Sequence, residues 1–334
     1  MKNITLGSTG ITVPQNAFGA LPIQRISAQD AAGLLKKAYE GGMRFFDTAR
    51  AYSDSEEKMG LGLADVREQI YIASKTASKT SEGFWKDLET TLTNLKTDYL
   101  DIYQFHCADR VFAPGDGSGM YEAMLEANKQ GKIRHIGITA HKIGVAEEAV
   151  ESGLYETLQF PFSYLSAERE LALVENCRKH NMGFIAMKGL AGGLINHSAA
   201  AMAYMTQFDN VLPIWGIQKE SELDEWLAFM DETPQMTDEI RAFIVKECQE
   251  LTGDFCRGCG YCMPCPAGIM INQCARMSLM LRRAPSAAWL TEEMQEEMKK
   301  IEGCLECGAC KKKCPYELDT PALLKKNYED YKRV

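Results

Sequence analysis

The spacing of the cysteines limits what this chain can be more than any other feature of its sequence. Nine of the 12 cysteines in the 334 residues lie after residue 250. Eight of the nine form two runs, which read Cys256-x2-Cys259-x2-Cys262-x2-Cys265-Pro266 and Cys304-x2-Cys307-x2-Cys310-x3-Cys314-Pro315. Structural zinc sites combine cysteine pairs into four tetrahedral ligands, and a triple run with this spacing departs from that pattern. The runs therefore predict a different kind of metal-binding tail.

The spacing is typical of the [4Fe–4S] clusters of bacterial ferredoxins, in which three cysteines of one run share a cluster with the last cysteine of the other run. It predicts two clusters. The ligands of one are then Cys256, Cys259, Cys262 and Cys314, and the ligands of the other are Cys304, Cys307, Cys310 and Cys265. The first run departs from the pattern, because only two residues separate Cys262 from Cys265. Cys274 therefore remains an alternative to Cys265.

The composition excludes several classes of protein. Hydrophobic residues make up 46% of the chain and charged residues 25%, which are ordinary values for a globular protein and exclude disordered or collagen-like chains. The formal net charge of −9 argues against a general nucleic-acid binder, because such binding depends on clustered Lys and Arg. No stretch approaches the roughly 20 apolar residues of a membrane span, and no secretory signal follows Met1. We therefore expect a cytoplasmic protein with reduced thiols that binds neither nucleic acid nor membrane.

From residue 1 to about 230, short apolar runs alternate with amphipathic segments, which is the pattern of repeated βα units. The expected strands are 16–19, 45–47, 70–74, 100–104, 133–139, 157–160, 183–187 and 211–216, after a hairpin of 4–6 and 11–13. Eight units favour a closed (β/α)8 TIM barrel. A doubly wound open sheet shares the local pattern, but the Gly-x-Gly-x-x-Gly typical of a Rossmann domain does not follow the first strand.

The sequence thus predicts an α/β chain with three parts. Residues 1–235 form the barrel with its N-terminal hairpin, 236–252 form a connecting helix, and 253–334 form a small α-helical, bacterial ferredoxin-like dicluster domain. Helices are expected at 81–95, at 237–251 and from Thr291 onward.

Four reactive side chains fall at the expected carboxyl ends of strands, where TIM barrels carry their active sites. Asp47, Lys75 and His106 each close an apolar run, and Tyr52 follows Asp47 by five residues. Taken singly, each is more often a solvated loop residue or a satisfied polar group. Together they suit proton transfer, because a buried Lys⁺ lowers the pKa of a tyrosine from its usual value of about 10, a carboxylate holds the lysine, and a neutral histidine orients the substrate oxygen.

These residues lie in segments that closely resemble the aldo/keto reductases. The resemblance covers about residues 1–225 and is carried by Phe46-Asp47-Thr48-Ala49-Arg50-Ala51-Tyr52, Ser55-Glu56-Glu57-Lys58-Met59-Gly60, Ser74-Lys75-Thr76 and Tyr99-Leu100-Asp101-Ile102-Tyr103-Gln104-Phe105-His106. It implies that Tyr52 is the general acid, that Lys75 and Asp47 tune it, and that His106 polarises the carbonyl. With its cysteine runs, the chain resembles a branch of that family with a C-terminal two-cluster ferredoxin-like domain.

The resemblance also implies a nicotinamide cofactor, NAD(H) or NADP(H). Thr139 and Gln159 stand where the family holds the carboxamide, and Phe162 where an aromatic ring stacks on the nicotinamide. Ala140 replaces the amide side chain that is usual there. A stretch that resembles the loop over the pyrophosphate contains Lys188, Gly189, Leu190 and Gly192.

After the eighth strand the family usually carries basic residues for the 2′-phosphate of NADP, whereas residues 217–226 of this chain are rich in carboxylates. Carboxylates repel a phosphate, so we expect a preference for NADH, with Glu222 or Gln218 near the ribose. The alternative is a plain acidic helix start, which the helix dipole favours.

Three functions are compatible with these features. In the first, the chain reduces a small-molecule carbonyl or oxidises the alcohol with nicotinamide, and the clusters exchange electrons with a ferredoxin or flavoprotein carrier or are structural. In the second, a ferredoxin supplies the electrons without nicotinamide and the four barrel residues supply protons. In the third, the chain is a non-catalytic electron-transfer subunit with a barrel scaffold. The intact set of four argues against the third, and the sequence does not identify the substrate.

Overall fold

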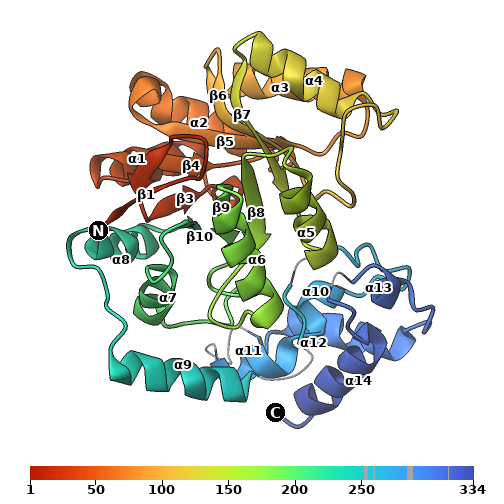
Figure 1. Cartoon of the computed structure of the whole chain (residues 1–334). Coiled ribbons are helices and arrows are strands. Elements are labelled where there is room, and N and C mark those ends of the chain that lie inside the picture. The colour runs from red at the N-terminus through yellow and green to blue at the C-terminus, as the bar shows by residue number, and fades with distance from the viewer. Residues whose placement is uncertain (252–254, 259, 284–288, 315) are drawn as a thin grey trace. The chain divides into compact units, whose positions relative to one another are not determined.

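A computed structural model of the chain describes residues 1–251, 255–258, 260–283, 289–314 and 316–334 (Figure 1). The chain forms two compact units. The first comprises Met1–Gly189 with His197–Arg241, and the second comprises Leu190–Asn196 with Ala242–Val334. The short segment 190–196 thus belongs to the second unit although barrel residues flank it in the sequence. The domain limits 1–235, 236–252 and 253–334 stay a prediction.

The first unit, all of whose residues are described, is a closed parallel barrel with the strand order β10-β3-β4-β5-β6-β7-β8-β9. These strands are β3 (Ala17–Gly19), β4 (Phe45–Asp47), β5 (Tyr71–Thr76), β6 (Leu100–Phe105), β7 (Ile133–Thr139), β8 (Thr157–Pro161), β9 (Gly183–Met187) and β10 (Val211–Gly216). Because the sheet is closed, the structure confirms the expected TIM barrel and excludes the doubly wound open sheet. Each strand lies within two residues of the segment expected from the sequence.

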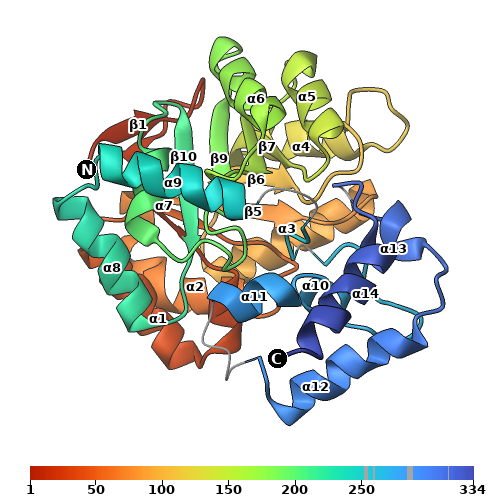
Figure 2. The same ribbon diagram turned by 90° about the horizontal axis from the view of Figure 1, so that it is seen from below.

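Helices alternate with the strands and surround the barrel (Figure 2). They are α1 (Ala28–Glu40), α2 (Ser55–Leu63), α3 (Ser81–Leu95), α4 (Met120–Lys129), α5 (Ile143–Ser152), α6 (Glu168–Lys179), α7 (Ser198–Met205) and α8 (Glu220–Asp231), with the 3-10 turns η1 (Pro22–Arg25) and η2 (Ala64–Gln69). Two starts are explained by capping, since the side chain of Ser27 accepts from the N–H of Asp30 and that of Thr80 from the N–H of Gly83.

The N-terminal hairpin covers one end of the barrel. Strands β1 (Asn3–Thr5) and β2 (Thr12–Pro14) pair antiparallel, one residue away from the expected segments. Ile4 and Val13 are buried in one cluster with Phe45, the first residue of β4. The hairpin therefore fills the amino end of the barrel and leaves reactive groups to the carboxyl end.

The described parts of the second unit are helical. They comprise most of α9 (Asp238–Glu250), together with α10 (Ile271–Cys274), α11 (Met277–Arg283), α12 (Glu292–Lys299), η4 (Lys300–Gly303), α13 (Ala309–Lys312) and α14 (Thr320–Tyr331). Helix α14 packs against α10, α11, α12 and α13. The helices expected at 237–251 and after Thr291 are present, and Thr291 caps α12 by accepting from the N–H of Met294.

One buried carboxylate joins three elements of the barrel wall. Asp101 in β6 is fully buried, and its Oδ2 accepts from Arg67 Nη2 at 2.7 Å and from the N–H of Ile72 at 2.9 Å. Its Oδ1 lies 3.2 Å from Arg134 Nη1 in β7. Breaking a buried ion pair is expensive, because the remaining charge stays out of water without a partner.

We expect Asp101→Asn to lower the free energy of unfolding by about 3 kcal/mol, because Arg67 keeps its buried charge and loses its counterion. Denaturant unfolding followed by circular dichroism measures the change. The matched control is Asp109→Asn, which removes an exposed partner of Lys79 and is expected to change stability by less than about 1 kcal/mol. Equal effects of the two substitutions would contradict this account of Asp101.

Candidate active site and cluster ligands

The closed barrel brings the four predicted catalytic side chains to one place. Asp47 ends β4, Lys75 lies in the neighbouring strand β5, and His106 follows β6 directly. Tyr52 lies in the connection between β4 and α2. Because parallel neighbours end on the same side of a barrel, the carboxyl ends of these three strands share one rim.

Lys75 is the centre of this group. Its Nζ donates to Asp47 Oδ1 at 2.7 Å and to the backbone oxygen of Thr48 at 2.6 Å. The same Nζ lies 5.2 Å from the centre of the Tyr52 ring, and the rings of Tyr52 and His106 meet edge to face with centres 5.6 Å apart. The structure thus places all four side chains in mutual reach.

The pKa of Tyr52 differs from the sequence-based expectation. Burial, followed by the charge of Asp47, raises the pKa of Tyr52 well above its ordinary value. The expected lowering by Lys75 is not seen, since the ammonium of Lys75 is bound to Asp47 and the Thr48 carbonyl. The phenol of Tyr52 is therefore protonated at neutral pH, which is the form that donates a proton.

His106 is neutral for two reasons. Burial and, after it, the charge of Lys75 lower the pKa of His106 to about 3. Burial and the nearby Lys188 and His106 also lower the pKa of His141 well below its usual value. No sequence motif marks His141, and its position two residues after Thr139 is the available signal.

Gln104 in β6 is a second polar residue of the site that no sequence motif marks. Its Nε2 donates to Gln159 Oε1 at 2.9 Å, and Gln159 Nε2 approaches Asp47 Oδ1 at 3.4 Å. Gln104 thereby orients Gln159 toward the ion pair. Two acceptors of this network, Asp47 Oδ2 and Gln104 Oε1, are buried and receive no hydrogen bond from the described residues. A polar ligand with donor groups fits such a site.

Thr139 and Phe162, the other residues expected to contact the nicotinamide, already have partners within the barrel unit. Thr139 Oγ1 accepts from the N–H of Cys107 at 2.7 Å. Phe162 is 1% exposed, and its ring packs against Phe184 and Phe208. A ring enclosed in this way presents no open face, so its packing disfavours the stacking role that the resemblance implied.

The glycine-rich stretch after β9 is divided between the units. Lys188 and Gly189 belong to the first unit, whereas Leu190 and Gly192 belong to the second. A side chain at Gly189 would place its Cβ 2.5 Å from the ring of Trp215, so the close packing of this turn requires glycine.

The acidic start of α8 has local structural roles. Glu222 Oε2 accepts from the N–H groups of Gln218 at 2.9 Å and Lys219 at 3.1 Å, which caps the helix. Lys37 forms ion pairs with Glu220 and Asp224, each at 2.5 Å. These contacts match the alternative of an acidic helix start.

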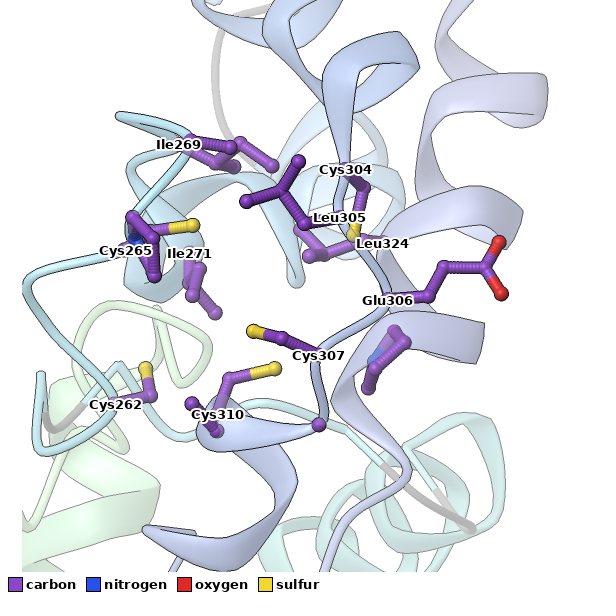
Figure 3. Close-up of a pocket in the computed structure, with 15 residues that line it drawn as sticks. Cys262, Cys265, Ile269, Ile271, Cys304, Leu305, Glu306, Cys307, Cys310 and Leu324 are labelled. Atoms are coloured by element: carbon purple, nitrogen blue, oxygen red, sulfur yellow. The ribbon is translucent and has the colours of Figure 1, made fainter.

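In the second unit, one set of predicted cluster ligands lines a cavity. Figure 3 shows thiols from both cysteine runs around this space. The cysteines that line it are Cys262, Cys265, Cys304, Cys307 and Cys310. Burial is the main cause of the raised pKa of Cys310, and charges on Cys304 and Cys265 add to it. Four of the five are the set that the crossed pattern assigns to one cluster.

The remaining cysteines lie elsewhere. Cys256 and Cys314 are outside this cavity, and Cys259 lies outside the described residues. Cys274 is fully buried, its thiol lies 3.9 Å from the backbone oxygen of Glu297, and burial raises its pKa to about 12. Cys265 lines the cavity and Cys274 does not, which favours Cys265 as the distal ligand.

Among the described residues, no three Cys, His, Asp or Glu side chains are placed to bind a single metal ion. A [4Fe–4S] cluster makes a different demand, since each of its four thiolates binds a separate iron atom at a corner of a cube. Several thiols spaced around a cavity suit a cluster better than one ion, and the donor set of this cavity therefore fits the group.

The closed barrel and the two cysteine runs are typical of an oxidoreductase whose TIM barrel is followed by an iron–sulfur domain. Comparison with known families agrees: the description of the aldo/keto reductase family matches residues 4–211, and that of a 4Fe-4S dicluster domain matches residues 255–319. The chain belongs to the aldo/keto reductase family. Among the described residues, no helix is long and apolar enough to cross a membrane.

Curated relatives match part of the chain. An L-galactose dehydrogenase of Arabidopsis thaliana is 29% identical over 211 residues, which are 57% of this chain and 66% of that protein. A methylglyoxal reductase of Salmonella typhi is 34% identical over 148 residues, 42% of this chain and 52% of that protein. The chain thus spans about two thirds or less of these relatives.

Solved structures show the same fold. An aldo-keto reductase of Bacillus halodurans has a TM-score of 0.65 at 20% identity and covers 74% of this chain and 96% of its own. One from Klebsiella pneumoniae, solved in complex with NADP and acetate, has a TM-score of 0.63 at 22% identity, covering 74% and 95%. At these identities the likeness supports the barrel fold only.

We predict that Cys265→Ser lowers the bound iron by about half, because it removes one ligand of one of two clusters. Iron and acid-labile sulfide, measured after anaerobic reconstitution, give the readout. The matched control Cys274→Ser is expected to retain all of the iron. If Cys274→Ser loses iron and Cys265→Ser keeps it, Cys274 is the ligand and the assignment made from the cavity is wrong.

Proposed function

We propose that the chain is an iron–sulfur oxidoreductase that reduces a small-molecule carbonyl, or oxidises the corresponding alcohol, with Tyr52 as the general acid or base. The observation that supports this most is the buried Lys75–Asp47 pair, with the Tyr52 ring 5.2 Å from Lys75 Nζ and His106 edge-on to Tyr52. A protonated phenol beside a neutral imidazole supplies what carbonyl reduction needs at the oxygen atom: a donated proton and an orienting hydrogen bond.

The residues have separate tasks in this proposal. His106, neutral because of its lowered pKa, donates an N–H to the carbonyl oxygen and orients it. Tyr52 delivers its hydroxyl proton to that oxygen. Lys75, fixed by Asp47 and the Thr48 carbonyl, stabilises the phenolate that remains.

We further propose that a nicotinamide is the hydride source, held by Thr139 and Gln159. When bound, it supplies two electrons as one hydride. The buried acceptors Asp47 Oδ2 and Gln104 Oε1 support a polar ligand at this point of the barrel. The carboxylates around Gln218 favour NADH over NADPH, because they repel a 2′-phosphate.

The two cysteine runs are proposed to hold two [4Fe–4S] clusters that exchange electrons with a ferredoxin or flavoprotein carrier. Cys265, Cys304, Cys307 and Cys310 hold one, and Cys256, Cys259, Cys262 and Cys314 hold the other. A cluster passes one electron at a time, so a carrier that handles single electrons is required. The second candidate function is reduction by a ferredoxin without nicotinamide, which Ala140 favours because it lacks the usual amide.

We expect Tyr52→Phe to lower kcat for carbonyl reduction by at least about 100-fold, because it removes the proton donor and little volume. Turnover of a panel of aldehydes that includes methylglyoxal is measured, together with iron content. Tyr39→Phe is the matched control, since its hydroxyl binds Gln69 on an exposed helix surface. Unchanged turnover in Tyr52→Phe, with iron retained, would remove the proposed barrel chemistry.

The proposed coenzyme preference predicts a KM for NADH at least about tenfold below that for NADPH, which corresponds to about 1.4 kcal/mol of electrostatic discrimination. Initial rates at varied concentrations of each coenzyme give the two KM values. A separate anaerobic titration with each coenzyme follows the absorbance of the clusters. Bleaching by NADH without a partner protein would show coupling between the barrel and the clusters. A strong preference for NADPH would overturn the prediction, and turnover with reduced ferredoxin but with neither coenzyme would favour the second candidate.

A further inference from the structure

The second unit buries one arginine beside the first cysteine run. Arg276, between α10 and α11, is 7% exposed. Its Nη2 donates to the backbone oxygen of Gly192 at 2.5 Å and lies 3.1 Å from Met280 Sδ. No carboxylate of the described residues forms an ion pair with it. A buried guanidinium with only neutral partners is unusual, because charges leave water at a high cost unless a counterion accompanies them.

The backbone around Arg276 is shaped for its guanidinium. Gly192 and Gly258 both have positive φ, at 67° and 66°. A Cβ added to them would lie 2.8 Å and 2.4 Å from Arg276 Nη1. Side chains at either position would therefore displace the guanidinium, and two glycines leave it the space.

Gly258 connects this arginine to a predicted cluster ligand. It lies two residues after Cys256, and its N–H points to Cys256 Sγ at 3.4 Å. Burial lowers the pKa of Arg276, and a negative charge on Cys256 opposes that shift. A [4Fe–4S] cluster with four thiolates is an anion in its oxidised and its reduced state, and bound to Cys256 it would be the missing counterion.

The cavity of the other cysteine set has a different electrostatic character. Its non-cysteine lining is mostly apolar and includes Ile269, Ile271 and Leu324. The one charged residue among its lining residues is Glu306, which binds Lys325. A cluster there gains no buried positive charge from its lining, so the two predicted sites are electrostatically unequal.

We propose that Arg276 raises the reduction potential of the cluster bound through Cys256, so that this cluster is reduced before the one bound through Cys304, Cys307 and Cys310. A nearby positive charge stabilises the reduced cluster more than the oxidised one, because reduction adds one negative charge. An electron that enters at the Cys304–Cys310 cluster then passes to the Cys256 cluster, which oxidises the first and reduces the second by one electron each. The inference rests on the two clusters of the proposed function.

The test uses the full chain, reconstituted anaerobically and titrated with dithionite while electron paramagnetic resonance follows each cluster. Arg276→Gln is expected to lower the higher of the two midpoint potentials and to leave the lower one in place. The equilibrium constant for electron exchange between the clusters should fall at least tenfold, which equals about 59 mV for one electron. Arg276→Lys keeps the charge and should shift the potential less. Arg282→Gln, an exposed arginine of α11, is the matched control and should change neither potential.

Iron content separates this inference from the proposal on which it rests. Wild-type protein that reconstitutes only one cluster would refute the two-cluster proposal, whatever Arg276 does. With both clusters present, unchanged potentials in Arg276→Gln would overturn the role of Arg276, as would equal shifts in the Gln and Lys variants. Loss of one cluster in Arg276→Gln but not in Arg276→Lys would support a required positive charge, whereas loss in both variants would contradict it.

Discussion

The chemistry proposed for the barrel depends on the ion pair between Lys75 and Asp47. Both side chains are almost wholly buried, at 1% and 2% exposure, and a buried pair persists only where its geometry is good and its remaining donors are satisfied. Neighbouring strands β4 and β5 supply that geometry, and the Thr48 carbonyl takes a further donor of Lys75. Closure of the barrel prevents the two strands from separating, so the position of the ammonium is a property of the whole sheet.

Burial around this pair shifts the pKa values of Tyr52 and His106 in opposite directions. It disfavours the charged form of every group, so it raises the pKa of Tyr52 and lowers that of His106. The phenol keeps its proton and the imidazole does not gain one. The neutral pair suits proton donation and carbonyl orientation. Burial is the main cause of both pKa shifts, and the charges of Asp47 and Lys75 add to them.

The sequence predicted the elements well, because apolar runs of strand length between amphipathic segments are a local signal. It also placed Asp47, Lys75 and His106 on one rim, since strand ends follow from strand positions. It did not predict the pKa of Tyr52 or the enclosure of Phe162, because both depend on how completely distant segments cover a side chain. Gln104 and Arg276 were missed for the same reason: Arg276 meets Gly192 across 84 residues of sequence.

The proposed clusters of the second unit can together hold as many electrons as one hydride carries. A hydride carries two electrons, and two [4Fe–4S] clusters that each accept one electron hold two between them. If the proposed clusters fill singly, a half-reduced state exists, and the difference between their potentials decides where its electron resides. The apolar lining at Cys304–Cys310 and the buried arginine beside Cys256 make the two positions unequal. Inequality of this kind gives a relay a direction, which two identical sites cannot have.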